Sequence, residues 1–75
     1  MDDNSLDIEV ALKEDKTGEY KKVLLGEILE EATSIKNQLN KGVSQEEYRQ
    51  LDALLKATEA AGEVVEQVWQ QAHLN

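Results

Sequence analysis

The chain has 75 residues, enough for one domain, and its 16 acidic against 8 basic residues give a net charge of −8. An acidic surface repels phosphates, so nucleic acid and anionic membranes are disfavoured as ligands. Cysteine is absent and histidine occurs once, which excludes a disulfide and disfavours a metal site. Because a scaffold this small rarely stabilises itself through its own core, we expect it to need a protein partner and no cofactor.

Residues 1–17 carry an ambiguous pattern. Leu6, Ile8, Val10 and Leu12 alternate with polar residues, which is the period of a half-buried strand. Leu6 and Val10 also share a face at helical spacing, and a lone short strand would have nothing to pair with. We therefore interpret residues 1–17 as a short helix or an irregular arm. Met1-Asp2-Asp3-Asn4 lacks the basic start of a signal peptide, and no apolar run is long enough to span a bilayer, so we expect a cytoplasmic protein.

A helix is predicted over about residues 18–41. Proline is absent, and strong helix formers dominate the whole chain, so the fold class is expected to be all-α. Apolar residues in this segment recur in steps of three and four, which is one face of a helix. These residues are Tyr20, Leu24, Ile28, Ala32, Ile35 and Leu39. Val23, Leu25 and Leu29 widen the face.

The chain is predicted to turn back on itself over residues 42–44. Gly42 can adopt the left-handed conformation that ends a helix, and Lys41 places a cation near the negative end of the helix dipole. Ser44 fits the next N-cap, because its hydroxyl can accept from the amide of Glu47 while the Glu47 carboxylate accepts from the amide of Ser44. Residues 18–75 should therefore form an antiparallel helical hairpin.

The second hairpin helix is predicted over about residues 45–72, and it carries two adjoining apolar stripes. The first stripe keeps alternating spacings of three and four residues. It consists of Tyr48, Leu51, Leu55, Thr58, Gly62, Val65, Trp69 and Ala72. The second stripe consists of Leu54, Ala57, Ala61, Val64 and Val68. One neighbouring helix can cover only one of them.

We expect the first stripe to pack on the helix over residues 18–41, with Tyr48 near Leu39 and Trp69 near Tyr20. The second stripe is then left for a partner. Gly62 costs helix stability, which suggests either a packing reason or simple tolerance. The predicted hairpin core is Tyr20, Leu24, Ile28, Ile35, Leu39, Tyr48, Leu51, Leu55, Val65 and Trp69.

No group of residues has the spacing of a catalytic site, so we expect a protein that is not an enzyme. His73 is the only imidazole and has no cysteine or second histidine as companion, which indicates a solvated tail residue. Trp69 lies on the first stripe, where an anchor of the core or of an interface is more typical than a ring that stacks on a ligand. Of the glycines, only Gly42 has a clear backbone task.

Residues 20–70 resemble a known family. The features are a Leu39-x-x-Gly42 helix stop, a Ser-Gln-Glu-Glu-Tyr48 restart, and a long second helix. That helix bears Leu51, Leu54, Leu55, Glu59, Ala60, Val64 and Val65. In this order they are similar to the small needle co-chaperones of bacterial type III secretion, the YscE/PscE/SsaE type. Residues 1–17 do not match the family pattern.

The resemblance implies a cytoplasmic bacterial hairpin that pairs with a tetratricopeptide-like chaperone. That pair would hold the needle subunit soluble and monomeric before export. The implied contact residues are Leu54, Ala57, Ala61, Val64 and Val68, with Leu25 and Leu29 as extensions. An alternative is a self-associating structural or adaptor protein in which two hairpins form a four-helix bundle. A mimic of nucleic acid is disfavoured because the last 25 residues carry few acids.

Overall fold

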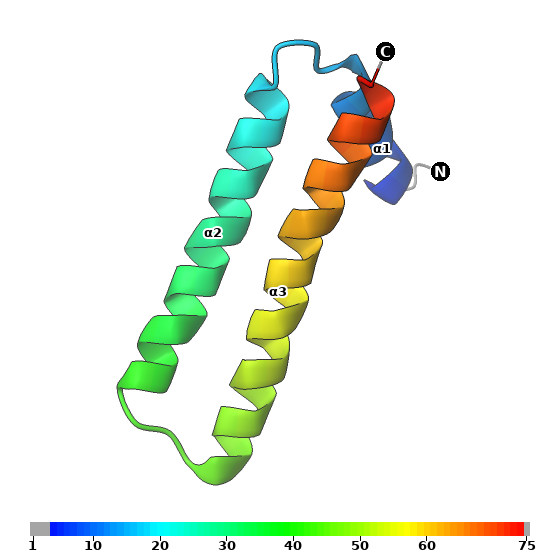
Figure 1. Ribbon diagram of the computed structural model, residues 1–75. Helices are drawn as coiled ribbons and strands as arrows, with labels where there is room; N and C mark the ends of the chain where they lie inside the picture. The colour runs from blue at the N-terminus through cyan, green and yellow to red at the C-terminus, as the bar shows by residue number, and fades with distance from the viewer. Residues whose placement is uncertain (1–3, 75) are drawn as a thin grey trace.

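The computed structural model describes residues 4–74, with side chains from residue 8 onward. These residues form three helices, α1 (Asn4–Glu14), α2 (Glu19–Asn40) and α3 (Gln45–Ala72). α2 and α3 run antiparallel along their length, and α1 packs beside the C-terminal end of α3 (Figure 1). The predicted all-α hairpin is confirmed, and the N-terminal segment is the short helix. The prediction about the first three residues, and the side chain of Leu6, lie outside what the structure describes.

The turn between α2 and α3 has the predicted chemistry. Gly42 has a φ of +88°, and its amide donates to the carbonyl of Leu39 at 3.3 Å, which closes the last turn of α2. The amide of Glu47 donates to the Ser44 hydroxyl at 3.1 Å, and the amide of Ser44 donates to the Glu47 carboxylate at 3.1 Å. This reciprocal pair satisfies amides that the first turn of α3 would otherwise leave unpaired.

The junction between α1 and α2 uses a second glycine turn. Gly18 is the N-cap of α2 with a φ of +84°, so it also has a backbone task, and Gly42 is not alone in this. Because glycine has no side chain to cap the helix, two earlier residues supply the acceptors. The Asp15 carboxylate accepts from the amide of Lys21 at 2.9 Å, and the Thr17 hydroxyl accepts from the amide of Glu19 at 3.3 Å.

The core of the described residues is thin. Among residues 8–74, only Leu12, Ala32, Ile35 and Val65 are buried. Leu12 is 2% exposed, so α1 contributes one of the most deeply buried side chains and is more than an arm attached to the hairpin. Most of the other predicted core positions are half-buried, because two helices cover each other along one stripe only. They are Tyr20, Leu24, Ile28, Leu39, Leu51, Leu55 and Trp69.

Tyr48 is a correction to the predicted core. Its side chain is 53% exposed, although it lies on the stripe that faces α2. Tyr48 is in the first turn of α3, at the closed end of the hairpin, whereas α1 packs at the opposite end. No third helix of the described chain therefore covers that end.

Gly62 lies against α2. A Cβ atom at this position would sit 3.7 Å from Cγ2 of Ile28 and 3.9 Å from Cδ2 of Leu25, both ordinary contact distances. The packing of the two helices thus leaves room for alanine, which favours tolerance over a packing requirement. Among the described residues, no helix is long and apolar enough to cross a membrane.

Candidate partner-binding surface

A strip of apolar residues on α3 is open to solvent. Leu54 is 50% exposed and Val64 is 56% exposed, and Ala57 and Ala61 between them are also exposed. We call these residues the α3 strip; they are most of the second stripe predicted from the sequence. Soluble monomers seldom leave a contiguous apolar surface uncovered unless it meets a partner.

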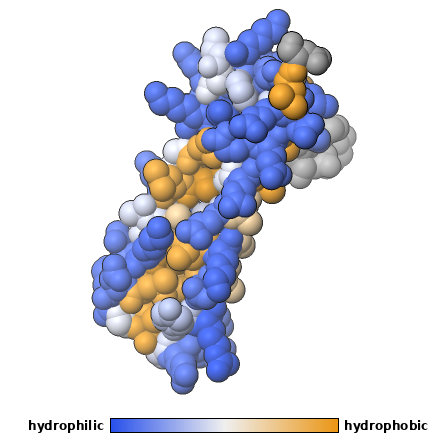
Figure 2. Space-filling model, in the orientation of Figure 1, coloured by the Kyte–Doolittle hydropathy of each residue, from blue (hydrophilic) through white to orange (hydrophobic). Residues whose placement is uncertain are grey.

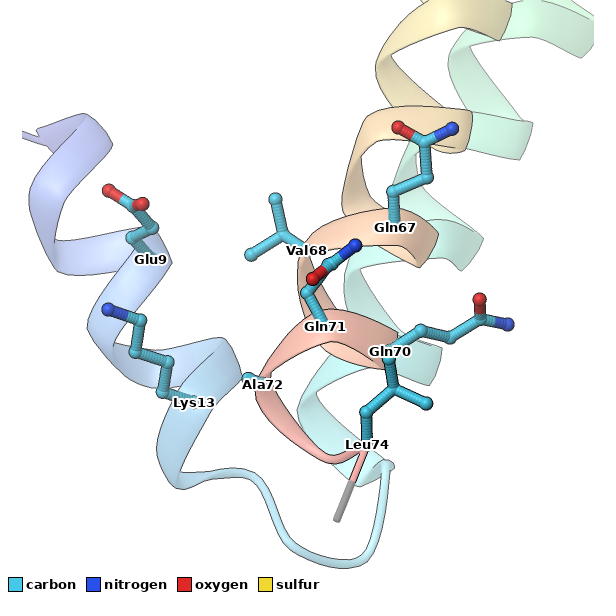
Figure 3. Close-up of a pocket in the computed structure, with 8 residues that line it drawn as sticks. All are labelled: Glu9, Lys13, Gln67, Val68, Gln70, Gln71, Ala72 and Leu74. Carbon is cyan, nitrogen blue, oxygen red and sulfur yellow. The ribbon is translucent and has the colours of Figure 1, made fainter.

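Val68, the last residue of the predicted second stripe, has a different environment. It is half-buried and lines an open groove of about 620 Å³ between α1 and the C-terminal part of α3. Figure 3 shows Val68 on the side of α3 toward α1, with Glu9 and Lys13 of α1 across the groove. The chain's own N-terminal helix therefore approaches one end of the second stripe, and the α3 strip is the part left open.

Leu25 and Leu29 lie on another surface. They line a groove between α2 and α3, which we call the α2–α3 groove. Its lining is Leu25, Ile28, Leu29, Ala32, Lys36, Glu59, Gly62, Glu63 and Glu66. At about 100° per residue, the α3 side of this groove is roughly half a turn around the helix from the α3 strip. The structure therefore does not join Leu25 and Leu29 to the α3 strip.

Trp69 anchors the open end of the hairpin. Its indole Nε1 donates to the backbone carbonyl of Asp15 at 2.9 Å. The Lys21 ammonium lies 4.2 Å from the centroid of the Trp69 ring and 3.2 Å from the Glu66 carboxylate. These contacts join the α1–α2 junction and both hairpin helices, so the role of Trp69 is that of an anchor within its own chain.

His73 extends the same cluster, and its predicted status as a solvated tail residue is wrong. The side chain is half-buried, and its ring centroid is 4.3 Å from that of Trp69. Its Nε2 lies 3.0 Å from the backbone carbonyl of Leu12, which fits an N–H donor on that nitrogen. No local sequence pattern predicts this contact, because it joins positions 61 residues apart.

Asp15 has a perturbed carboxyl group. Burial raises the pKa of Asp15, but the amide of Lys21 donates to the charged form and lowers it. Further hydrogen bonds from Tyr20, Trp69 and Gly18 act in the same direction, and the pKa lies below its ordinary value of 3.8. This residue was not singled out in the sequence, although an aspartate three positions before a glycine that starts a helix is a recognisable turn signal.

Within residues 4–74, no group of three histidine, cysteine, aspartate or glutamate side chains is placed to hold a metal ion. Three candidate binding surfaces on the described chain are the α3 strip, the groove beside α1 and the α2–α3 groove. Two of the three have apolar residues at their centre, which is typical of sites that bind another protein chain.

Comparison with known families agrees with this description. Residues 7–71 match the family described as the cytoplasmic E component of the needle of the type III secretion system. The match covers most of the chain, and the protein belongs to this family, so the resemblance noted from the hairpin pattern is confirmed. It also includes most of α1, which the sequence pattern had left unmatched. No curated protein and no solved structure matches the chain.

Proposed function

We propose that this protein is a co-chaperone in the bacterial cytoplasm. It pairs with a tetratricopeptide-like chaperone through the α3 strip, and the pair keeps the needle subunit soluble and monomeric before export. The observation that carries the proposal is the exposed strip of Leu54, Ala57, Ala61 and Val64 in a member of a needle-component family.

The shape of the α3 strip suits another helix. Ala57 and Ala61 have small side chains, which lower the surface and let a second helix approach closely. Leu54 and Val64 flank them and are each about half exposed, so a covering helix would gain on the order of 1 kcal/mol from each. Tetratricopeptide-like proteins stack helix pairs, and the pair at the end of a stack needs a polar cap. A hairpin with an exposed apolar strip and a net negative charge fits that need.

The role is one of binding, with no catalytic step, no cofactor and no nucleic-acid or membrane ligand. The family description supports a place among secretion components. The net charge of −8 supports the exclusion of anionic ligands.

Co-expression tests the proposal. The chain carries an affinity tag and is produced with a tetratricopeptide-like protein and a needle-sized protein from the same bacterium. We expect the three to co-purify as one small complex, and the needle subunit to polymerise or precipitate when the chain is left out. A needle subunit that stays monomeric without the chain would contradict the proposal. A chain that forms only its own dimers, and takes up no chaperone, would favour the four-helix bundle.

A further inference from the structure

The α2–α3 groove has an apolar floor with a charged border. Leu25 and Ile28 are half-buried and Ala32 is buried, while Leu29 stands 65% exposed at the edge. Figure 2 shows a hydrophobic band between α2 and α3 with hydrophilic atoms along both sides. An elongated apolar surface between two helices has the shape that receives a third helix.

The α3 side of the groove is acidic. Glu59, Glu63 and Glu66 line it, with Lys36 on the α2 side. The Glu66 carboxylate is already bound to the ammonium of Lys21. Glu59 and Glu63 form no ion pair with any described residue, and at a spacing of four they are like charges on one helix face, which destabilises α3.

We propose that the α2–α3 groove binds an amphipathic helix of a partner protein, whose apolar stripe is bordered by lysine or arginine residues four positions apart. The apolar stripe would cover Leu29 and Leu25. The paired cations would meet Glu59 and Glu63 and relieve their repulsion. The negative charge of the whole chain would also speed the encounter with a cationic segment.

This inference goes beyond the chaperone pairing. The α3 strip lies roughly half a turn around α3 from the glutamates of the groove, so one partner can occupy the strip while another occupies the groove. The hairpin would then join two protein segments instead of capping one.

The test measures binding of two synthetic peptides to the full chain by isothermal titration calorimetry. Both are amphipathic helices of about five turns with the same leucine stripe. One carries lysines at four-residue spacing beside the stripe, and the other carries glutamates. We expect the lysine peptide to bind and the glutamate peptide to bind at least about tenfold more weakly.

Two pairs of variants locate the site. Leu29→Gln should weaken the affinity for the lysine peptide by about tenfold. Leu54→Gln, the same change on the α3 strip, should leave that affinity nearly unchanged. The double variant Glu59→Lys with Glu63→Lys should reverse the preference toward the glutamate peptide. Glu27→Lys with Glu31→Lys changes the net charge equally at exposed α2 positions outside the groove, and should keep the original preference.

An equal loss of affinity for the lysine peptide in the two double variants would show that net charge alone drives binding. That result would overturn the proposal. Loss from Leu54→Gln but not from Leu29→Gln would place the peptide on the α3 strip, which also overturns it. So would the absence of binding by the lysine peptide. These results are independent of the chaperone pairing, because each peptide experiment uses the chain without the tetratricopeptide-like protein.

Discussion

The indole nitrogen of Trp69 donates a 2.9 Å hydrogen bond to the backbone carbonyl of Asp15, 54 positions earlier in the chain. The bond ties the end of α3 to the segment that joins α1 and α2. With Leu12 buried and His73 against the Leu12 carbonyl, it makes α1 part of the folded unit. Three helices, and not two, therefore share the small core.

Trp69→Phe tests this anchor. Phenylalanine keeps much of the apolar surface but removes the indole donor and weakens the contact with the Lys21 ammonium. We expect a loss of about 1 to 2 kcal/mol in the free energy of unfolding, measured by urea titration. Tyr48→Phe is the control, since Tyr48 is largely exposed, and it should stay within about 0.5 kcal/mol of the parent. Equal midpoints for both variants would show that the anchor contributes nothing.

Leu12→Ala tests whether α1 belongs to the core. Leu12 is 2% exposed, so removing its side chain should cost about 2 to 5 kcal/mol, a large part of the stability of a chain this small. Val10→Ala, at a position 43% exposed on the same helix, should cost far less. The measurement is thermal unfolding followed by circular dichroism. Similar melting curves for the two variants would mean that α1 is only loosely attached.

The Asp15 carboxylate should make the junction between α1 and α2 sensitive to acid. Its pKa in the folded protein lies below the ordinary value of 3.8, so its charged form stabilises the fold above that pH. This contribution is lost as the pH falls below 3.8 and through the folded-state pKa. Asp15→Asn should therefore be less stable than the parent at pH 6, and the difference should shrink at pH 3. A difference that is the same at both pH values would contradict the assigned role of the carboxylate.

Gly42 and Gly26 form a matched pair. A Cβ atom would meet no heavy atom within 4 Å at either position, but only Gly42 has a positive φ. Gly42→Ala should therefore destabilise the protein by about 1 kcal/mol, and Gly42→Val by more. Gly26→Ala, in the middle of α2, should stabilise it by up to about 1 kcal/mol. Urea titration gives both values, and a Gly42→Ala protein as stable as the parent would show that the turn does not need the left-handed conformation.

Ser44→Ala removes one half of the reciprocal cap at the start of α3. We expect a loss of about 1 kcal/mol, because the amide of Glu47 then has no side-chain acceptor. Ser34→Ala, at an exposed position within α2, is the control and should be neutral or slightly stabilising. Unfolding by urea compares the two, and an unchanged midpoint for Ser44→Ala would contradict the cap.

The features that were predictable from the sequence are those made by neighbours along the chain. The turn at Gly42 and the cap at Ser44 depend on residues within a few positions, and the facing stripes of α2 and α3 follow from helical spacing. The contacts that tie α1 and the segment after it to α3 join positions 61 and 54 residues apart, and no local pattern encodes them. Tyr48 has the right spacing for the core, but spacing does not reveal that the end of a two-helix structure lacks a cover.

The residues predicted to bind the partner lie on separate surfaces, for a related reason. Helical spacing assigns Val68 to the second stripe, but it could not show that α1 would approach that end. Leu25 and Leu29 extend the face of α2 in sequence, yet in space they lie in the α2–α3 groove. The packing of separate helices decides which apolar residues form one continuous surface. The amphipathic pattern of a single helix does not specify that packing.

The most direct test of the account is co-purification of Ala61→Arg with the tetratricopeptide-like chaperone. Ala61 lies at the centre of the α3 strip, where a long charged side chain would clash and lose its water in an interface. Ser34→Arg introduces the same side chain at an exposed position on α2, outside the α3 strip. We predict that Ala61→Arg keeps its helical circular dichroism but loses the chaperone, while Ser34→Arg retains it. Retention of the chaperone by a folded Ala61→Arg protein would contradict the assignment of the α3 strip as the binding surface.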